Sequence, residues 1–175
     1  MKVDYPSNAI SSRSEKLPSC RDFLSHKAEI ISVLRSTGRP GIEAVIRFLE
    51  SSDFFTAPCH THHTYSGGLA EHSLETYHIA LNAHPELPKD SIAICCLLHD
   101  VCTAKGSGTD WFHGHGIRSK GILQSHCHLA MTSEEQDAIR FHMHRHCPAY
   151  QDSALARAVF HADKDSAHAW HTGRE

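Results

Sequence analysis

One short stretch of this sequence constrains the fold more than any other. Residues 92–98 are nearly all apolar, and His99 and Asp100 follow them directly. Such a run belongs in the middle of a hydrophobic core, where a carboxylate without a partner is costly to bury. Because neutral imidazole and ionised carboxylate are both metal ligands, one bound cation would satisfy both side chains. The stretch therefore predicts a metal site inside the molecule, for which the chain offers further candidate ligands: His72, His115, His142 and Asp163.

The spacing of apolar residues predicts helices throughout the chain. Apolar residues recur at helical intervals, and no stretch alternates apolar and polar residues over a useful length. We expect helices over about residues 21–35, 42–49, 69–81, 90–102, 116–123, 134–144 and 155–170, separated by breaks rich in Gly and Pro. At 175 residues the chain has the length of one domain. We predict an all-α, single-domain helical bundle over residues 20–175, preceded by a loosely packed polar arm at 1–19.

Several helix ends are marked in the sequence. Ser133, with Gln136 three residues later, has the spacing of a capping box and predicts a helix start. Pro148 should end that helix, because proline lacks the backbone donor that a helix interior needs. We expect Asp152 to cap the last helix.

Composition excludes several kinds of protein. The net charge is -3 and no basic stripe suggests a nucleic-acid groove, so we expect no stable nucleic-acid complex. The N-terminus has no apolar signal region, and no apolar run is long enough to span a bilayer, so we expect no membrane partner. Seven irregularly spaced cysteines without a CxxC pair favour reduced thiols and a cytoplasmic location. The 18 histidines are the one unusual number, and they cluster.

The order of the sequence motifs resembles a known family. "GGLAEHSL", "LLHDV" and "HADKDSA" are similar to the His, His-Asp and Asp motifs of the HD superfamily of metal-dependent phosphohydrolases. More narrowly, "HHTYSGGLAEHSL", "HGHGIRS" and "AIRFHMH" resemble one branch of that superfamily. The resemblance covers about residues 57–170 and implies the helical fold of an HD domain. It leaves the substrate open.

The resemblance also implies a set of metal ligands. The positions that hold one divalent cation in the family are matched by His72, His99, Asp100 and Asp163. His115 and His142 match positions that ligate a second ion in two-metal members and face the substrate phosphate in one-metal members. Imidazole and carboxylate donors suit Mn, Fe, Ni, Co, Zn or Mg, so we expect one or two divalent ions.

The reaction that the resemblance implies is hydrolysis of a phosphate ester by a metal-activated water. Asp100 would bridge two ions or orient that water. In many relatives a small residue and then a lysine follow the His-Asp pair, whereas Cys102 and Thr103 stand there in this chain. Lys105, two residues later, is our candidate to replace that lysine as a catalytic residue.

Three further residues are candidates for substrate binding. Arg118 and Ser119 follow His115 by about one turn, where they could hold a phosphate beside a helix N-terminus. His63 precedes a Gly pair and could line the opening of the site. The predicted partner is a small phosphorylated molecule, either a nucleotide or another small phosphometabolite.

Other functions are open at this point. The altered residues after the His-Asp pair would also fit a non-catalytic regulatory HD domain that binds metal and nucleotide without turnover. A phosphodiesterase acting on a cyclic or oligonucleotide substrate is a further alternative, and a metal-free interaction protein is a third. The N-terminal arm and the first two helices could cover the site as a lid or form the contact of a homodimer.

Simpler explanations exist for several of the candidate ligands. His99 and Asp100 could be a buried polar pair that neighbouring groups satisfy without a metal. Asp163 could pair with Lys164 or Arg157 on its own helix. A separate zinc site could be formed by His142, His146 and either Cys147 or Cys127.

Overall fold

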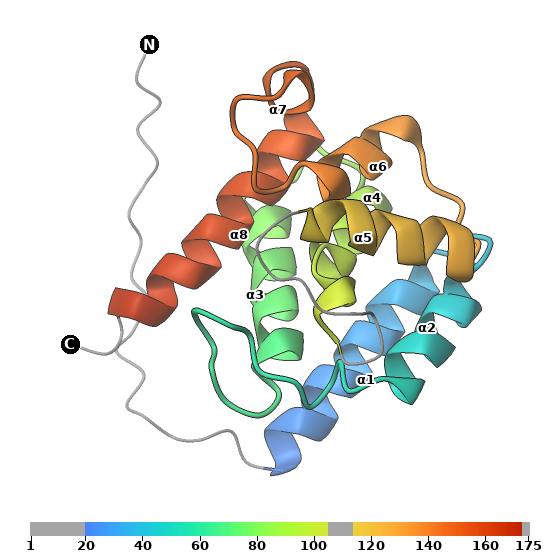
Figure 1. The fold of residues 1–175 in the computed structure, drawn as a ribbon, viewed down its shortest axis with the longest axis vertical. Helices are drawn as coiled ribbons and strands as arrows, with labels where there is room; N and C mark the ends of the chain where they lie inside the picture. Colours follow the sequence, from blue (N-terminus) through green and yellow to red (C-terminus); the bar gives the residue numbers. More distant parts are fainter. Residues whose placement is uncertain (1–19, 105–113, 173–175) are drawn as a thin grey trace.

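The structure of the protein is a computed structural model that describes residues 20–104 and 114–172, and it confirms the all-α prediction (Figure 1). Within these ranges every regular element is a helix or helical turn: α1 (Cys20–Ser36), α2 (Ile42–Ser51), α3 (Gly68–Ala83), α4 (Lys89–Leu98), the 3-10 turn η1 (Val101–Thr103), α5 (His115–Gly121), the π-helical turn η2 (Ile122–His126), α6 (Ser133–Arg140), α7 (Pro148–Asp152) and α8 (Ala154–Thr172). None of the described helices is long and apolar enough to cross a membrane. The arm predicted at 1–19 lies outside the described residues.

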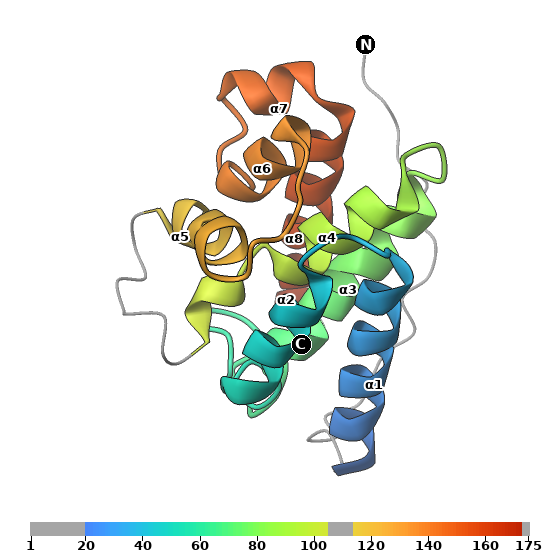
Figure 2. The same ribbon diagram turned by 90° about the vertical axis from the view of Figure 1, so that its right-hand side faces the viewer.

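Helix α4 carries the apolar stretch and lies at the centre of the fold (Figure 2). Every residue from Ser91 to Leu98 is buried, and the helix packs against α1, α3, α6 and α8. A helix that is apolar on all sides has no face suited to water, so it takes the core position. The end of α4 therefore lies inside the protein, and His99 follows it there with no exposed surface.

Two pairs of helices meet around the end of α4. Helices α3 and α8 lie side by side, and α5 packs on α6 (Figure 1). The first pair supplies His72 from α3 and Asp163 from α8. In the second pair, α5 begins with His115, and His142 follows the end of α6. The packing thus brings four of the candidate ligands towards the end of the central helix.

The capping box of α6 lies one residue earlier than predicted. It is formed by Thr132 and Glu135 and not by Ser133 and Gln136. The Thr132 hydroxyl accepts a hydrogen bond from the Glu135 N–H at 3.1 Å, and the Glu135 carboxylate accepts one from the Thr132 N–H at 2.8 Å. A tertiary contact explains this shift of the capping box, because the buried Glu135 carboxylate also binds Arg39 from another part of the chain.

The following helix boundaries also differ from the predictions. Helix α6 ends at Arg140, four residues early, and Pro148 does not end it but begins the short α7. Proline suits the first position of a helix, where its missing N–H would have no partner. The last helix is capped by Ser153, whose hydroxyl accepts from the Ala156 N–H at 3.0 Å. Asp152, the predicted cap, is the last residue of α7.

A partly buried ion-pair network fixes the loop between α1 and α2. The Arg39 guanidinium lies 2.6 Å from the Asp90 carboxylate and 2.8 Å from that of Glu135. Ser91 donates a hydrogen bond to the same Glu135 oxygen at 2.6 Å. Glu135 has no exposed surface, so its charge depends on these partners. The network ties this loop to the starts of α4 and α6.

Candidate metal centre

The end of α4 determines which way the His99 imidazole faces. His99 Nδ1 lies 2.8 Å from the carbonyl oxygen of Cys96, at the point where the helix ends. A carbonyl oxygen can only accept, so Nδ1 carries the proton of this hydrogen bond. Burial lowers the pKa of His99 to about 4, so the imidazole is neutral at neutral pH. Its Nε2 atom therefore carries a lone pair, which points to the space between the other candidate ligands.

A first group of donor atoms comes from α3, α8 and the end of α4. His72 Nε2 lies 3.2 Å from His99 Nε2 and 3.2 Å from Asp163 Oδ1. The distance from His99 Nε2 to Asp163 Oδ1 is 3.7 Å, and all three side chains are buried. Donor atoms that bind one ion at about 2.1 Å lie roughly 3 Å apart. These three side chains are therefore close enough to share a cation.

A second group comes from α5 and the turn after α6. His115 Nε2 and His142 Nε2 lie 3.0 Å apart, at 3.6 and 3.4 Å from Asp100 Oδ1. His142 Nδ1 donates a hydrogen bond to the carbonyl oxygen of Ile139 at 2.7 Å. This contact repeats the arrangement of His99 at the end of α4. It leaves His142 Nε2 facing His115 and Asp100.

The two carboxylate oxygens of Asp100 face different donor groups. Oδ2 lies 3.6 Å from His99 Nε2, whereas Oδ1 faces His115 and His142. Asp100 is held at this place because it follows His99 and precedes the η1 turn. The arrangement therefore has the form of two donor groups joined by one carboxylate.

The site holds two ionised carboxyl groups. Burial alone would raise the pKa of Asp100 and of Asp163, but the surrounding imidazoles lower both pKa values well below the ordinary range. Burial also works against a charge on His142, but its contact with Asp100 raises the pKa of this histidine. The negative charge of the site therefore persists at neutral pH, and a cation that approaches His142 competes with a proton.

Two carboxylate oxygens of the site lack a hydrogen-bond donor. Asp100 Oδ1 and Asp163 Oδ2 are buried and accept no hydrogen bond from the residues that the structure describes. Asp163 Oδ2 has an ion-pair partner in Lys164 Nζ at 3.4 Å, whereas Asp100 Oδ1 faces the imidazoles of His115 and His142. A carboxylate oxygen is costly to bury without a hydrogen-bond donor. Within the same residues, close donor groups are formed by His72, His99 and Asp100 and by Asp100, His115 and His142. The donor set fits one or two divalent cations better than a polar pair that neighbouring groups satisfy.

The alternatives for Asp163 and His142 can be compared with these contacts. Asp163 Oδ2 does lie 3.4 Å from Lys164 Nζ, but Oδ1 of the same carboxylate faces His72. The described part of the chain contains no donor group with His146, Cys127 or Cys147. The geometry therefore favours the central cluster over a separate zinc site.

A third group of histidines adjoins His72. His63 is 2% exposed, with Nδ1 3.1 Å from His62 Nδ1 and Nε2 3.0 Å from Glu75 Oε2. The His63 backbone has a φ of 46°, and a Cβ atom on Gly68 would collide with the His63 carbonyl group. His63 was expected at the opening of the site, but the structure buries it, whereas His62 is partly exposed.

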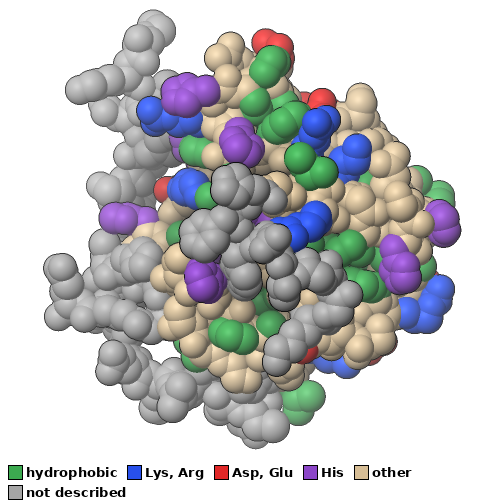
Figure 3. Space-filling model, viewed as in Figure 1, with side chains coloured by type: hydrophobic (Ala, Val, Ile, Leu, Met, Phe, Trp, Pro, Cys, Tyr) green, Lys and Arg blue, Asp and Glu red, His purple; other side chains and the backbone are tan. Residues whose placement is uncertain are grey.

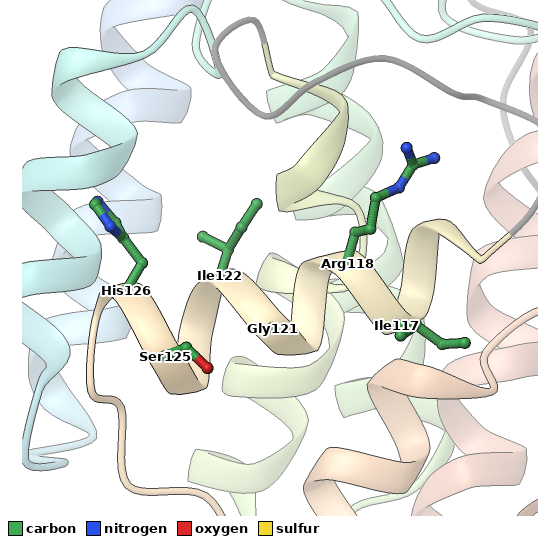
Figure 4. A pocket seen from close by; sticks show the side chains of 6 residues that line it. All are labelled: Ile117, Arg118, Gly121, Ile122, Ser125 and His126. Atoms are coloured by element: carbon green, nitrogen blue, oxygen red, sulfur yellow. The ribbon is translucent and has the colours of Figure 1, made fainter.

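Arg118 extends along a surface groove on α5 and η2. Figure 4 shows that Arg118, Ile122 and His126 project from the same side of this continuous helical segment. Their spacing of four residues explains the shared direction. Arg118 is partly exposed and follows His115 by about one turn of the helix.

The other two predicted residues of this region differ from Arg118. Ser119 has no exposed surface, and its hydroxyl accepts a hydrogen bond from the Cys102 N–H at 3.2 Å. Ser119 therefore braces the turn after Asp100 and does not present its hydroxyl to solvent. Lys105 lies outside the described residues.

Two residues beside the cluster have no counterpart in the sequence predictions. Glu75 lies one helical turn after His72, and Ser166 lies one turn after Asp163. Side chains three residues apart on a helix face the same side. A polar residue three positions after a predicted ligand was therefore the sequence signal that could have identified Glu75 and Ser166. Their distances from each other could not be read from the sequence.

Comparison with known proteins adds one finding. The sequence model of the HD domain family matches residues 69–168 of the 175-residue chain, and this range includes every predicted metal ligand. No curated protein and no solved structure gave a match. Because the matched region spans more than half of the sequence, this chain belongs to the HD domain family.

Proposed function

We propose that this protein is a metal-dependent phosphohydrolase that acts on a phosphate ester, either a nucleotide or another small phosphometabolite. The observation that carries the proposal is the pair of donor groups joined by Asp100. Membership of the HD domain family supports metal-dependent hydrolysis as the reaction class. The mixed imidazole and carboxylate donors suit Mn, Fe, Ni, Co, Zn or Mg.

The donor groups suggest a role for each ligand. A first ion would be held by His72, His99, Asp100 and Asp163. A second ion would be held by Asp100, His115 and His142. When bound, such ions neutralise phosphate oxygens and lower the pKa of a water molecule. Asp100 would give one oxygen to each group and so keep the two groups at a fixed separation.

Positive side chains flank the donor groups. Lys164 lies beside Asp163, and Arg118 lies one turn after His115. On the face shown in Figure 3, Lys and Arg side chains are more prominent than acidic ones. Such a surface attracts an anionic substrate, and a guanidinium group is suited to phosphate oxygens. Arg118 and Lys164 are therefore our candidates for phosphate binding, and Lys105 stays our candidate for the leaving group.

The proposal includes a binding partner and a cellular location. We expect a small phosphorylated substrate and no stable nucleic-acid complex. All six cysteines whose side chains are described are free thiols, which supports a reducing compartment such as the cytoplasm. A homodimer through the first helices is compatible with this function.

A hydrolysis assay on the full, untagged chain tests the proposal. The protein is loaded with each candidate metal and incubated with nucleoside monophosphates, sugar phosphates, cyclic nucleotides and short oligonucleotides. We expect metal-dependent phosphate release from a small monoester. Asp100→Asn should reduce this rate by roughly 100-fold or more, because it removes a charged ligand of both groups. Asp152→Asn changes an exposed carboxylate at the end of α7 and should keep the wild-type rate.

The outcomes separate the candidate functions. Cleavage of only cyclic or oligonucleotide substrates would identify a phosphodiesterase. Tight nucleotide binding without product over hours would identify a regulatory domain. Unchanged turnover in Asp100→Asn, with the helical circular dichroism preserved, would contradict the role of Asp100.

A further inference from the structure

His72 differs from the other buried histidine ligands in what holds its Nδ1 atom. His99 and His142 donate Nδ1–H to the carbonyl oxygen three residues earlier, because each follows the end of a helix. His72 lies inside α3, where backbone carbonyls serve the helix itself. The carbonyl three residues earlier, on Leu69, also accepts from the Ser73 hydroxyl at 2.9 Å. His72 therefore needs an acceptor from another side chain.

Ser166 on α8 is that acceptor. Its hydroxyl oxygen lies 2.9 Å from His72 Nδ1, and the hydroxyl donates to Glu75 Oε2 at 3.0 Å. A serine hydroxyl can donate one hydrogen bond, and here it donates that bond to the Glu75 carboxylate. The serine oxygen is then free to accept the proton of His72 Nδ1–H. The three side chains form a directed chain from an imidazole to a carboxylate.

Glu75 also holds a second histidine. The oxygen that accepts from Ser166 lies 3.0 Å from His63 Nε2. Burial alone would raise the pKa of Glu75, but the contacts with His63 and Ser166 lower it. The ionised carboxylate can accept from both donors, so it fixes the proton positions of both neighbours.

Another carboxylate competes for the proton of His72. Asp163 Oδ1 lies 3.2 Å from His72 Nε2, on the opposite side of the ring from Ser166. With its proton on Nε2, His72 would donate to Asp163 and would offer no lone pair to a cation there. With its proton on Nδ1, it donates to Ser166 and leaves Nε2 free. The position of one proton therefore decides whether His72 can act as a ligand.

We propose that Ser166 and Glu75 are positioning residues that keep the His72 proton on Nδ1 and so prepare Nε2 to bind the first cation. Hydrogen bonds to the outer nitrogen of a ligand imidazole orient the ring and increase its basicity. The proposal rests on the proposed function for the presence of the cation. The proton position itself is a property of the protein alone and can be measured separately.

Nitrogen-15 NMR of the full chain, with labelled histidine and with metal removed, tests the proton position. The His72 signal is assigned by comparison with His72→Asn. We expect the Nδ1–H form in the wild type and a shift towards Nε2–H in Ser166→Ala. Ser73→Ala removes a buried hydroxyl that donates to the Leu69 carbonyl oxygen of its own helix, and it should leave the His72 form unchanged. An Nε2–H form in the wild type, or an unchanged form in Ser166→Ala, would overturn the proposal.

Cation affinity is the second readout, measured by Co²⁺ titration with visible absorption. Ser166→Ala and Glu75→Ala should weaken the first binding step roughly 10- to 100-fold. Glu75→Gln keeps an acceptor oxygen and should recover most of this affinity. Equal affinity in all of these variants and the wild type would overturn the proposal. A wild-type protein that binds no Co²⁺ would instead contradict the proposed function, whereas the NMR result would still decide the role of Ser166 and Glu75.

Discussion

Gly116 of α5 lies directly against the carbonyl oxygen of Arg140 at the end of α6. A Cβ atom at Gly116 would lie 2.5 Å from that oxygen, which is closer than real side chains come. The close approach brings the start of α5 to the turn after α6, where His115 Nε2 and His142 Nε2 lie 3.0 Å apart. The second donor group therefore requires a residue without a side chain at position 116.

Gly116→Ala should remove the second ion and leave the first. The added methyl group forces α5 away from α6, and such overpacking costs about 1–3 kcal/mol in the free energy of unfolding. The bound metal should fall by about half in elemental mass spectrometry, and urea unfolding should show the loss of stability. Gly121→Ala is the matched control, because its Cβ would meet no atom of the described residues within 4 Å. Equal metal content in both variants would show that the contact does not position His115.

The ligand histidines should divide into two classes when each is changed to alanine. His99→Ala should remove the first ion, whereas His115→Ala and His142→Ala should remove only the second. His126→Ala, on η2 and outside both groups, should change neither. Elemental mass spectrometry of the untagged protein measures this directly, because a His tag would bind metal itself. Loss of all metal in His115→Ala would mean that the groups do not bind ions independently.

The affinity for the second ion should rise with pH around neutrality. The pKa of His142 is raised above its ordinary value of about 6.5, so a proton occupies this ligand at and below that pH. Each second ion that binds must displace that proton, and the affinity should level off once the pH exceeds the raised pKa. The first group contains His99 with a pKa of about 4, so its affinity should change less steeply. Calorimetry in buffers of different ionisation enthalpy counts the protons that are released on metal binding. If the second ion binds without releasing a proton, the predicted competition at His142 is wrong.

Arg39→Met should destabilise the protein far more than Arg35→Met. Loss of Arg39 leaves the fully buried Glu135 carboxylate without its cation, which costs about 3 kcal/mol or more. Arg35 also pairs with a carboxylate, that of Glu43, but both side chains are more than half exposed. Water screens such a pair, so its loss should have little effect. Urea unfolding of both variants makes the comparison, and similar midpoints would show that the network is not needed for stability.

Much of the fold could be predicted because its causes are local. An apolar stretch that ends in His99 and Asp100 can only be buried, and the structure places it in the central helix α4. Helical spacing identified α3 and α8 for the same reason. Not every wrong prediction has a distant cause, because Pro148 and Ser153 act within their own short segments. One error, however, arose because the partner of a residue comes from a distant part of the chain. The α6 capping box is the example, because Arg39 decides that Glu135 and not Gln136 is buried there.

The sequence by itself determined the fold class, the family and the kinds of side chain that can meet at the end of α4. Only the tertiary structure decided how they meet. Hydrogen-bond directions, such as that from Ser166 to Glu75, join residues that are 91 positions apart in the chain and lie on different helices. The same is true of the two oxygens of Asp100, which face different donor groups. Spacing along a chain sets the face on which a residue lies, but distances between faces arise from packing.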